Sequence, residues 1–193
     1  SFCDLLYKHP SDIKTVGVLG AGLMGSGITH VTAKGGMNVI VLDRNMEEAQ
    51  KAVAATRYPP RGNRGVAGGI RGNKFGRITD YWDRIEDETA VILQIETAAA
   101  IEQVQDIAAV DGVSGIFFGP ADISADIGKA GKPLDPAVWA LVKPAAQKLI
   151  AKGVPVGTLV LDPDFAAELL DEGFTFVACG TDVSLLARAT DGL

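Results

Sequence analysis

The sequence predicts an α/β protein in which parallel β-strands alternate with α-helices. Three observations support this class. Short apolar runs alternate with longer stretches of good helix formers along most of the 193 residues. Two of the longer stretches open with an Asp-Pro pair, in which the aspartate suits a helix cap and the proline suits the first turn. Repeated strand–helix units of this kind form parallel sheets with right-handed crossovers.

The individual elements follow from apolar spacing and from capping residues. About seven strands are expected, at residues 15–19, 37–42, 65–67, 90–96, 114–119, 156–161 and 175–180. Helices are expected at residues 46–57, 79–86, 98–110, 135–153 and 162–173. Thr97, Asp135 and Asp162 are the predicted caps of the last three helices. The strand at 65–67 is very short and lies inside a long loop rich in glycine and arginine.

The first strand leads into a glycine-rich turn, "GAGLMG". Gly20 allows a tight turn, Gly22 lets a pyrophosphate approach the backbone, and Gly25 lets a helix pack closely on the strand. The second strand, at residues 37–42, ends in Asp43, where a ribose-binding carboxylate is expected. Together these features predict a unit that binds a dinucleotide such as NAD. A glycine turn used only for close packing is the alternative.

Composition excludes several classes of function. The net charge of −6 argues against a nucleic-acid partner, which needs a basic face. No apolar run approaches the length of a membrane span, so no membrane partner and a cytoplasmic location are expected. The two cysteines are too few for a disulfide framework. The two histidines, His9 and His30, argue against a metal site built from several histidines.

Two acidic residues end neighbouring strands of the predicted sheet. Alternation along "VILQIE" places Gln94 and Glu96 on one face, with Glu96 at the carboxyl end of its strand. Asp122 follows the next strand in the segment "GPAD". Two carboxylates at adjacent strand ends suit a hard cation such as Mg²⁺ or Mn²⁺, with water filling the other positions. Solvated or salt-bridged acids at strand ends remain the alternative.

Several long motifs in the chain resemble one family. The segments "AVAATRYPPRGNRGV", "VILQIET", "AVDGVSGIFFGPADIS" and "FVACGTD" resemble the HpcH/HpaI class II, metal-dependent aldolases, which are TIM barrels. The resemblance implies that Glu96 and Asp122 are metal ligands. It also implies that the backbone N–H groups of Ala121 and Asp122 hold the carboxylate of a pyruvate enolate, with Gln94 beside them. A histidine after the first strand and an arginine after the second complete the site in that family.

The N-terminal part resembles a different family. The segment "VGVLGAGLMGSGITHVTAKGG" resembles the start of a 3-hydroxyacyl-CoA dehydrogenase domain. We therefore interpret the chain as a chimera: an extension at residues 1–14, a Rossmann-derived βαβ fragment at 15–47, and aldolase-derived βα units at 48–193, all packed as one domain. The expected fold is TIM-barrel-like with about seven strands, residues 15–19 and 37–42 replacing the second and third barrel strands. An open, doubly wound Rossmann-like sheet is the alternative.

Each family's site is incomplete in this interpretation. The leading hypothesis is therefore an engineered fold-recombination protein without efficient catalysis, which binds Mg²⁺ or Mn²⁺ weakly and NAD weakly. The first alternative is a metal-dependent pyruvate aldolase or lyase of low activity. The second is a module that binds NAD or its AMP half. Unpaired strands at residues 15–19 and 175–179 would leave open sheet edges, which predict a homo-oligomer.

Overall fold

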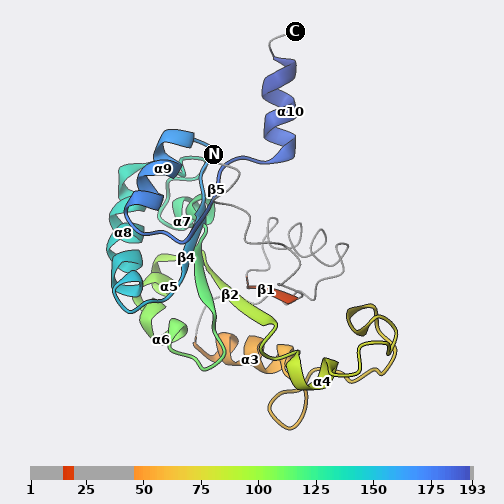
Figure 1. Ribbon diagram of the computed structural model, residues 1–193. Helices are drawn as coiled ribbons and strands as arrows, with labels where there is room; N and C mark the ends of the chain where they lie inside the picture. Colours follow the sequence, from red (N-terminus) through yellow and green to blue (C-terminus); the bar gives the residue numbers. More distant parts are fainter. Residues whose placement is uncertain (1–14, 20–45, 192–193) are drawn as a thin grey trace.

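The computed structural model describes residues 15–19 and 46–191. Five parallel strands form one sheet in the order β1-β2-β3-β4-β5 (Figure 1). Their bounds are Thr15–Leu19 for β1, Thr89–Ile95 for β2, Gly115–Phe118 for β3, Val156–Leu159 for β4 and Phe176–Ala178 for β5. The predicted α/β class with a parallel sheet is confirmed.

Helices connect the strands and cover the sheet. The helical elements are α3 (Met46–Thr56), the 3₁₀ turn η1 (Arg71–Asn73), α4 (Tyr81–Arg84), α5 (Ala98–Glu102), α6 (Val104–Ala108), α7 (Pro120–Asp126), α8 (Pro136–Ile150), α9 (Pro163–Asp171) and α10 (Asp182–Thr190). Figure 1 shows α5, α6, α8 and α9 on one side of the sheet, while α10 projects from the body of the domain. None of the helices in the described ranges has the length and apolar character to cross a membrane.

The three predicted helix caps are present. The Thr97 side chain accepts a hydrogen bond from Ala100 N at 3.1 Å. The Asp135 carboxylate accepts one from Ala137 N at 2.9 Å, and Asp162 accepts from the first turn of α9. These bonds satisfy N–H groups that have no carbonyl partner within the helix. The helix starts therefore follow from local sequence.

The core lies between the central strands and the covering helices. Ile116 and Phe118 of β3 are fully buried, as are Val142 and Leu149 of α8. The buried positions of α8 recur every three or four residues, so one stripe of this helix faces the sheet. Burying each such side chain contributes about 1.5–3 kcal/mol. This packing fixes β2 and β3, whose carboxyl ends carry the candidate site.

Three sequence predictions require correction. No strand forms at residues 65–67, because the segment lies in an exposed loop where the Val66 side chain is 66% exposed and meets no neighbouring strand. The helix expected at 79–86 is only the single turn Tyr81–Arg84. The helix expected at 98–110 divides into α5 and α6 at Gln103.

The structure defines the strand order at the N-terminal end of the sheet. β1 pairs directly with β2, with Thr15 opposite Thr89 and Leu19 opposite Leu93. Residues 37–42 lie outside the described ranges. Within those ranges, β1 and β5 are the outermost strands of the sheet.

Candidate active site at the carboxyl ends of β2 and β3

The predicted carboxylates lie at the same edge of the sheet. β2 and β3 pair in parallel, with Gln94 opposite Phe117 and Ile95 opposite Phe118. Glu96 follows the last residue of β2, and Asp122 lies in the first turn of α7, directly after β3. Because the two strands end at the same level, both acids lie at the carboxyl end of the sheet. This is the end of a parallel sheet where α/β proteins place their active sites.

Gly119 lies at the point where the three predicted polar side chains meet. A Cβ atom added to Gly119 would lie 3.2 Å from Gln94 Nε2, 3.3 Å from Glu96 Cγ and 3.4 Å from Asp122 Oδ2. One small volume is therefore in contact range of all three residues. Any side chain at position 119 would enter this volume, so glycine keeps it open. In the sequence, Gly119 directly precedes Pro120-Ala121-Asp122, but a glycine at this position carries no signal of a binding site.

Glu96 is held in place by an internal hydrogen bond. Gln94 Nε2 donates to Glu96 Oε1 at 2.6 Å, and both residues are only 6% exposed. This hydrogen bond fixes the rotamer of the buried side chain. Gln94 is thus a positioning residue for Glu96.

The start of α7 presents backbone donors beside the carboxylates. Gly119 is the N-cap of α7, and Pro120, Ala121 and Asp122 form the first turn. Ser124 donates its hydroxyl to the carbonyl oxygen of Ala121 at 2.7 Å, which ties this turn together. The N–H groups of Ala121 and Asp122 lie in the turn whose donors have no intrahelical acceptor. They are the groups that the family resemblance associates with a carboxylate.

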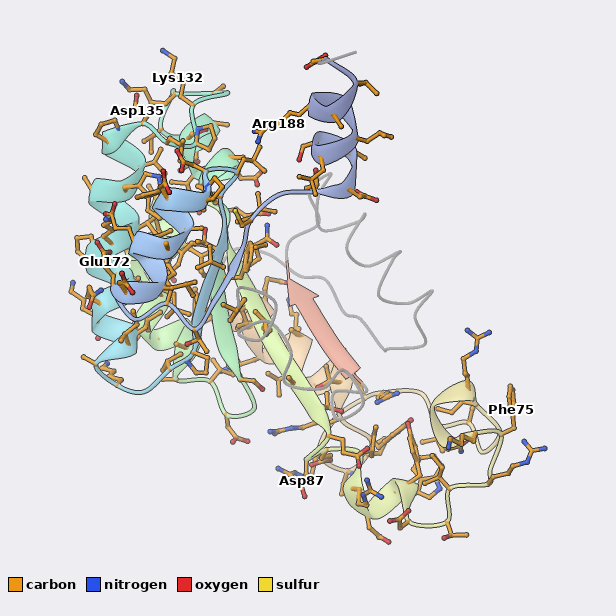
Figure 2. The ribbon with its side chains drawn as sticks, turned by 45° about the horizontal axis from the view of Figure 1, so that its top comes forward. Phe75, Asp87, Lys132, Asp135, Glu172 and Arg188 are labelled. Atoms are coloured by element: carbon orange, nitrogen blue, oxygen red, sulfur yellow. The ribbon has the colours of Figure 1, made fainter. Side chains whose placement is uncertain are left out.

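A cavity of about 470 Å³ opens next to this cluster. Its polar lining includes Gln94, Asp122, Thr181 and Arg188, and most of its remaining wall is apolar. The apolar residues are Phe117, Pro120, Pro133, Leu134, Leu159, Val160 and Leu161. A volume of this size suits a small molecule rather than a macromolecule. Figure 2 shows the Arg188 side chain extending from α10 toward the body of the domain.

The donor set of the cluster suits a hard divalent cation. Glu96 and Asp122 offer carboxylate oxygens. The described residues contain no group of three or more acidic, histidine or cysteine side chains that could hold a metal, so these two acids would be the protein's side-chain ligands at this point. Mg²⁺ binds through one or two carboxylates and keeps several waters, so two acids beside an open cavity match its needs. The residues therefore fit a metal whose remaining ligands are water and substrate.

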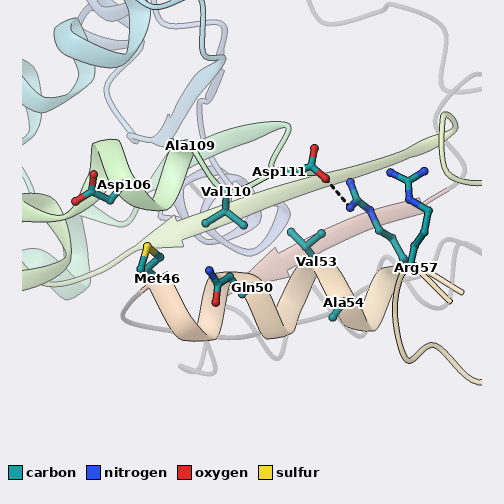
Figure 3. A pocket seen from close by; sticks show the side chains of 10 residues that line it. Met46, Gln50, Val53, Ala54, Arg57, Asp106, Ala109, Val110 and Asp111 are labelled. Atoms are coloured by element: carbon teal, nitrogen blue, oxygen red, sulfur yellow. Dashed lines mark hydrogen bonds and ion pairs between the residues drawn. The ribbon is translucent and has the colours of Figure 1, made fainter. Parts of the chain in front are cut away.

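A second cavity, of about 510 Å³, lies in the groove between α3 and α6 (Figure 3). Its positive charges are already paired: Arg57 Nη1 lies 2.8 Å from Asp111 Oδ2, and Arg61 forms an ion pair with Glu86. The Arg57 guanidinium lowers the pKa of Asp111 below its usual value. No residue predicted for a site lies here.

Comparison with known proteins identifies the family. The sequence profile of the HpcH/HpaI aldolase/citrate lyase family matches residues 24–189. The chain belongs to this family. The match begins inside the segment that we had assigned to a dehydrogenase, and it includes Asp43 and the expected strand at 37–42. The comparisons support neither the chimera nor NAD as its cofactor, and the interpretation as an engineered, non-catalytic protein is likewise unsupported.

Relatives of this HpcH/HpaI protein are named as aldolases. A pyruvate aldolase of Rhizobium etli is 45% identical over 150 residues, which cover 78% of this chain and 59% of that protein. A 4-hydroxy-2-oxo-heptane-1,7-dioate aldolase of Escherichia coli is 42% identical over 156 residues, covering 80% of this chain and 60% of that protein. The matched part of the chain thus spans about three fifths of the length of these relatives.

The fold agrees with solved structures of the family. An HpcH/HpaI aldolase/citrate lyase family protein from Burkholderia cenocepacia matches with a TM-score of 0.75 at 24% sequence identity, covering 100% of this chain and 97% of that one. The TIM-barrel-like prediction is therefore confirmed at the level of fold. Of the predicted site residues, Gln94, Glu96, Ala121 and Asp122 lie together. Gly20, Gly22, Gly25 and Asp43 lie outside the described residues.

Proposed function

We propose that this protein is a metal-dependent class II aldolase that cleaves a 4-hydroxy-2-oxo acid and releases pyruvate. The observation that carries the proposal is the convergence of Gln94, Glu96 and Asp122 on the volume beside Gly119. The family of the chain and the names of its relatives support the same reaction class. The relatives are longer than the matched segment, so the activity of the whole protein belongs to the proposal.

In this proposal Glu96 and Asp122 hold Mg²⁺ or Mn²⁺ through their carboxylate oxygens. Gln94 keeps the Glu96 carboxylate in its binding rotamer through the 2.6 Å hydrogen bond. A bound divalent cation supplies Lewis acidity toward the 2-oxo group of the substrate. Burial of Glu96 strengthens its charge interactions, because little water screens it.

The substrate carboxylate is oriented by the backbone at the start of α7. The N–H groups of Ala121 and Asp122 donate hydrogen bonds to it and fix the plane of the 2-oxo acid. The rest of the substrate extends into the cavity, where the apolar wall near Phe117 and Leu159 excludes water from the reacting bond. Orientation of this kind supplies a large part of the rate enhancement when a bond must break in one direction.

Two assays on the purified protein test the proposal. The first follows exchange of the pyruvate methyl protons with D₂O by NMR in the presence of Mg²⁺. The second follows cleavage of a 4-hydroxy-2-oxo acid with Mn²⁺, coupled to pyruvate detection. We expect both activities to need metal and to fall at least about a hundredfold in Glu96→Gln and in Asp122→Asn.

Glu102→Gln provides the matched control, because Glu102 is an exposed acid at the end of α5 and does not line the cavity. This variant should retain the activity of the unmodified protein. Metal-independent turnover, or full activity in both Glu96→Gln and Asp122→Asn, would contradict the proposed function. Metal binding measured by calorimetry then shows whether the two acids bind a cation at all.

A further inference from the structure

The peptide that joins β3 to α7 is held by both neighbouring strands. Its N–H group, on Gly119, donates to the carbonyl oxygen of Ile95 in β2 at 2.9 Å. Its carbonyl group, on Phe118, accepts a hydrogen bond from the Thr158 hydroxyl of β4 at 3.0 Å. Because a peptide unit is planar, bonds to both of its polar groups fix its orientation. The entry into the first turn of α7 is therefore set from two sides.

Both ends of this arrangement lead directly to the candidate site. Ile95 immediately precedes Glu96, and Gly119 immediately precedes the turn that contains Asp122. The bond between Gly119 and Ile95 therefore ties this turn to Glu96. The Thr158 hydroxyl holds the same peptide from β4, a strand that supplies none of the three polar side chains around Gly119. The contribution of β4 to the site is thus made through the backbone of its neighbour.

Packing alone does not explain a threonine at position 158. The residue is fully buried, and it lies opposite Phe118 in the register of β3 and β4. Valine would fill almost the same space without a hydroxyl that must find an acceptor. A buried hydroxyl is favourable only where it is bonded, and its acceptor here is the carbonyl that leads into α7. The donor is therefore the feature that distinguishes Thr158 from a residue used only for packing.

We propose that Thr158 is a positioning residue for the substrate: it holds the peptide that leads into α7 and thereby aims the backbone donors of the first turn at the substrate carboxylate. This inference rests on the proposed function, because it takes the N–H groups of Ala121 and Asp122 as the carboxylate site. Hydrogen bonds weaken steeply when donor and acceptor are misaligned, and a backbone donor has no rotamer with which to adjust. The metal is held by side-chain carboxylates, which can adjust by rotation. Loss of the Thr158 hydroxyl should therefore weaken substrate binding and leave metal binding unchanged.

Substitutions at position 158 separate the hydroxyl from packing. Thr158→Val removes the donor and keeps the branched shape, whereas Thr158→Ser keeps the donor and removes a methyl group. Calorimetry measures the dissociation constant for pyruvate at saturating Mn²⁺ and, separately, that for Mn²⁺ alone. In Thr158→Val we expect the pyruvate constant to rise about tenfold, equivalent to about 1.4 kcal/mol, and the Mn²⁺ constant to stay the same. Thr158→Ser should bind pyruvate as the unmodified protein does. Thr158→Ala, which also lacks the donor, should show the same rise and replaces Thr158→Val if that variant does not fold.

Thr56→Val provides the matched control. Thr56 is also buried, and its hydroxyl donates to a backbone carbonyl, that of Val53, at 2.7 Å. It is the last residue of α3 and does not line the cavity beside α7. Its substitution should lower the Tm without changing the affinity for pyruvate. A merely structural role of Thr158 predicts instead that the affinity for pyruvate follows the Tm in every variant, Thr158→Ser and Thr56→Val included.

The inference is overturned by unchanged pyruvate affinity in Thr158→Val, by an equal loss in Thr158→Ser, by a parallel loss of Mn²⁺ affinity, or by no pyruvate binding to the unmodified protein with Mn²⁺ present. Failure of the proposed function gives a different result. Metal-dependent cleavage that is lost in Glu96→Gln, together with unchanged pyruvate affinity in Thr158→Val, leaves the function standing and removes the role of Thr158. Pyruvate binding that needs the hydroxyl, together with no metal-dependent turnover, supports the positioning role and removes the proposed catalysis.

Discussion

Gly119→Ala is the most informative single substitution, because it adds one methyl group at the meeting point of three site residues. The new Cβ atom would lie 3.2 Å from Gln94 Nε2, 3.3 Å from Glu96 Cγ and 3.4 Å from Asp122 Oδ2. The backbone itself accepts alanine, since Gly119 has a φ of −97°. The perturbation is therefore confined to the side chains of the candidate site.

The expected magnitudes follow from these contacts. Overpacking a tight site costs about 1–3 kcal/mol. Replacing glycine at a compatible position recovers about 0.4–1 kcal/mol by restricting the unfolded chain. The balance is a net loss of about 1–2 kcal/mol, or a decrease of about 2–8 °C in Tm for a protein of this length. Because Glu96 and Asp122 must shift apart, the dissociation constant for Mn²⁺ should rise about tenfold.

Calorimetry with Mn²⁺ and a thermal melt measure the two effects separately. Gly72→Ala is the matched control, because the nearest atoms to its new Cβ would lie at 3.6 Å, an ordinary van der Waals distance. We expect this control to keep both the Mn²⁺ affinity and the Tm of the unmodified protein. Unchanged Mn²⁺ affinity in Gly119→Ala would refute the argument that the carboxylates beside Gly119 bind the metal.

Four further predictions concern stability and assembly. Asp162→Ala removes the cap of α9 and should lower the free energy of unfolding by about 1 kcal/mol, measured by urea denaturation. Gly157→Ala places a Cβ 1.9 Å from the Phe176 ring and should destabilise by about 1–3 kcal/mol; an unchanged melt would contradict this packing. The hydrogen bond from Ala137 N lowers the pKa of Asp135, so its stabilising effect is present above the ordinary value of 3.8 and is lost as the pH falls through the lowered pKa. Melts between pH 6 and pH 2 should therefore show a smaller decrease in Tm for Asp135→Asn than for the unmodified protein. Finally, β1 and β5 are the outermost strands among the described residues and predict a dimer or larger assembly at high micromolar concentration. A monomer throughout a dilution series measured by sedimentation would argue against unpaired edges at these two strands.

The sequence by itself determined the elements whose signals are local. Thr97, Asp135 and Asp162 mark helix starts, because a cap is made by a side chain and an N–H group two or three residues further along. The apolar runs of β2 and β3 likewise predict these two strands from the local sequence. The proximity of Glu96 and Asp122 could also be predicted from the sequence. Both acids follow strand ends, and consecutive parallel strands end at one edge of a sheet.

Only the tertiary structure decided which distant segments meet. A segment forms a strand only where a neighbour is available to share backbone hydrogen bonds. The tertiary structure therefore decides that β1 pairs directly with β2 and that residues 65–67 form no strand. The position of Arg188 in the cavity lining depends on the direction in which α10 leaves Gly180, which no periodicity within the helix encodes. Gly119 contributes by having no side chain, so its importance emerges only when Gln94, Glu96 and Asp122 are placed around it.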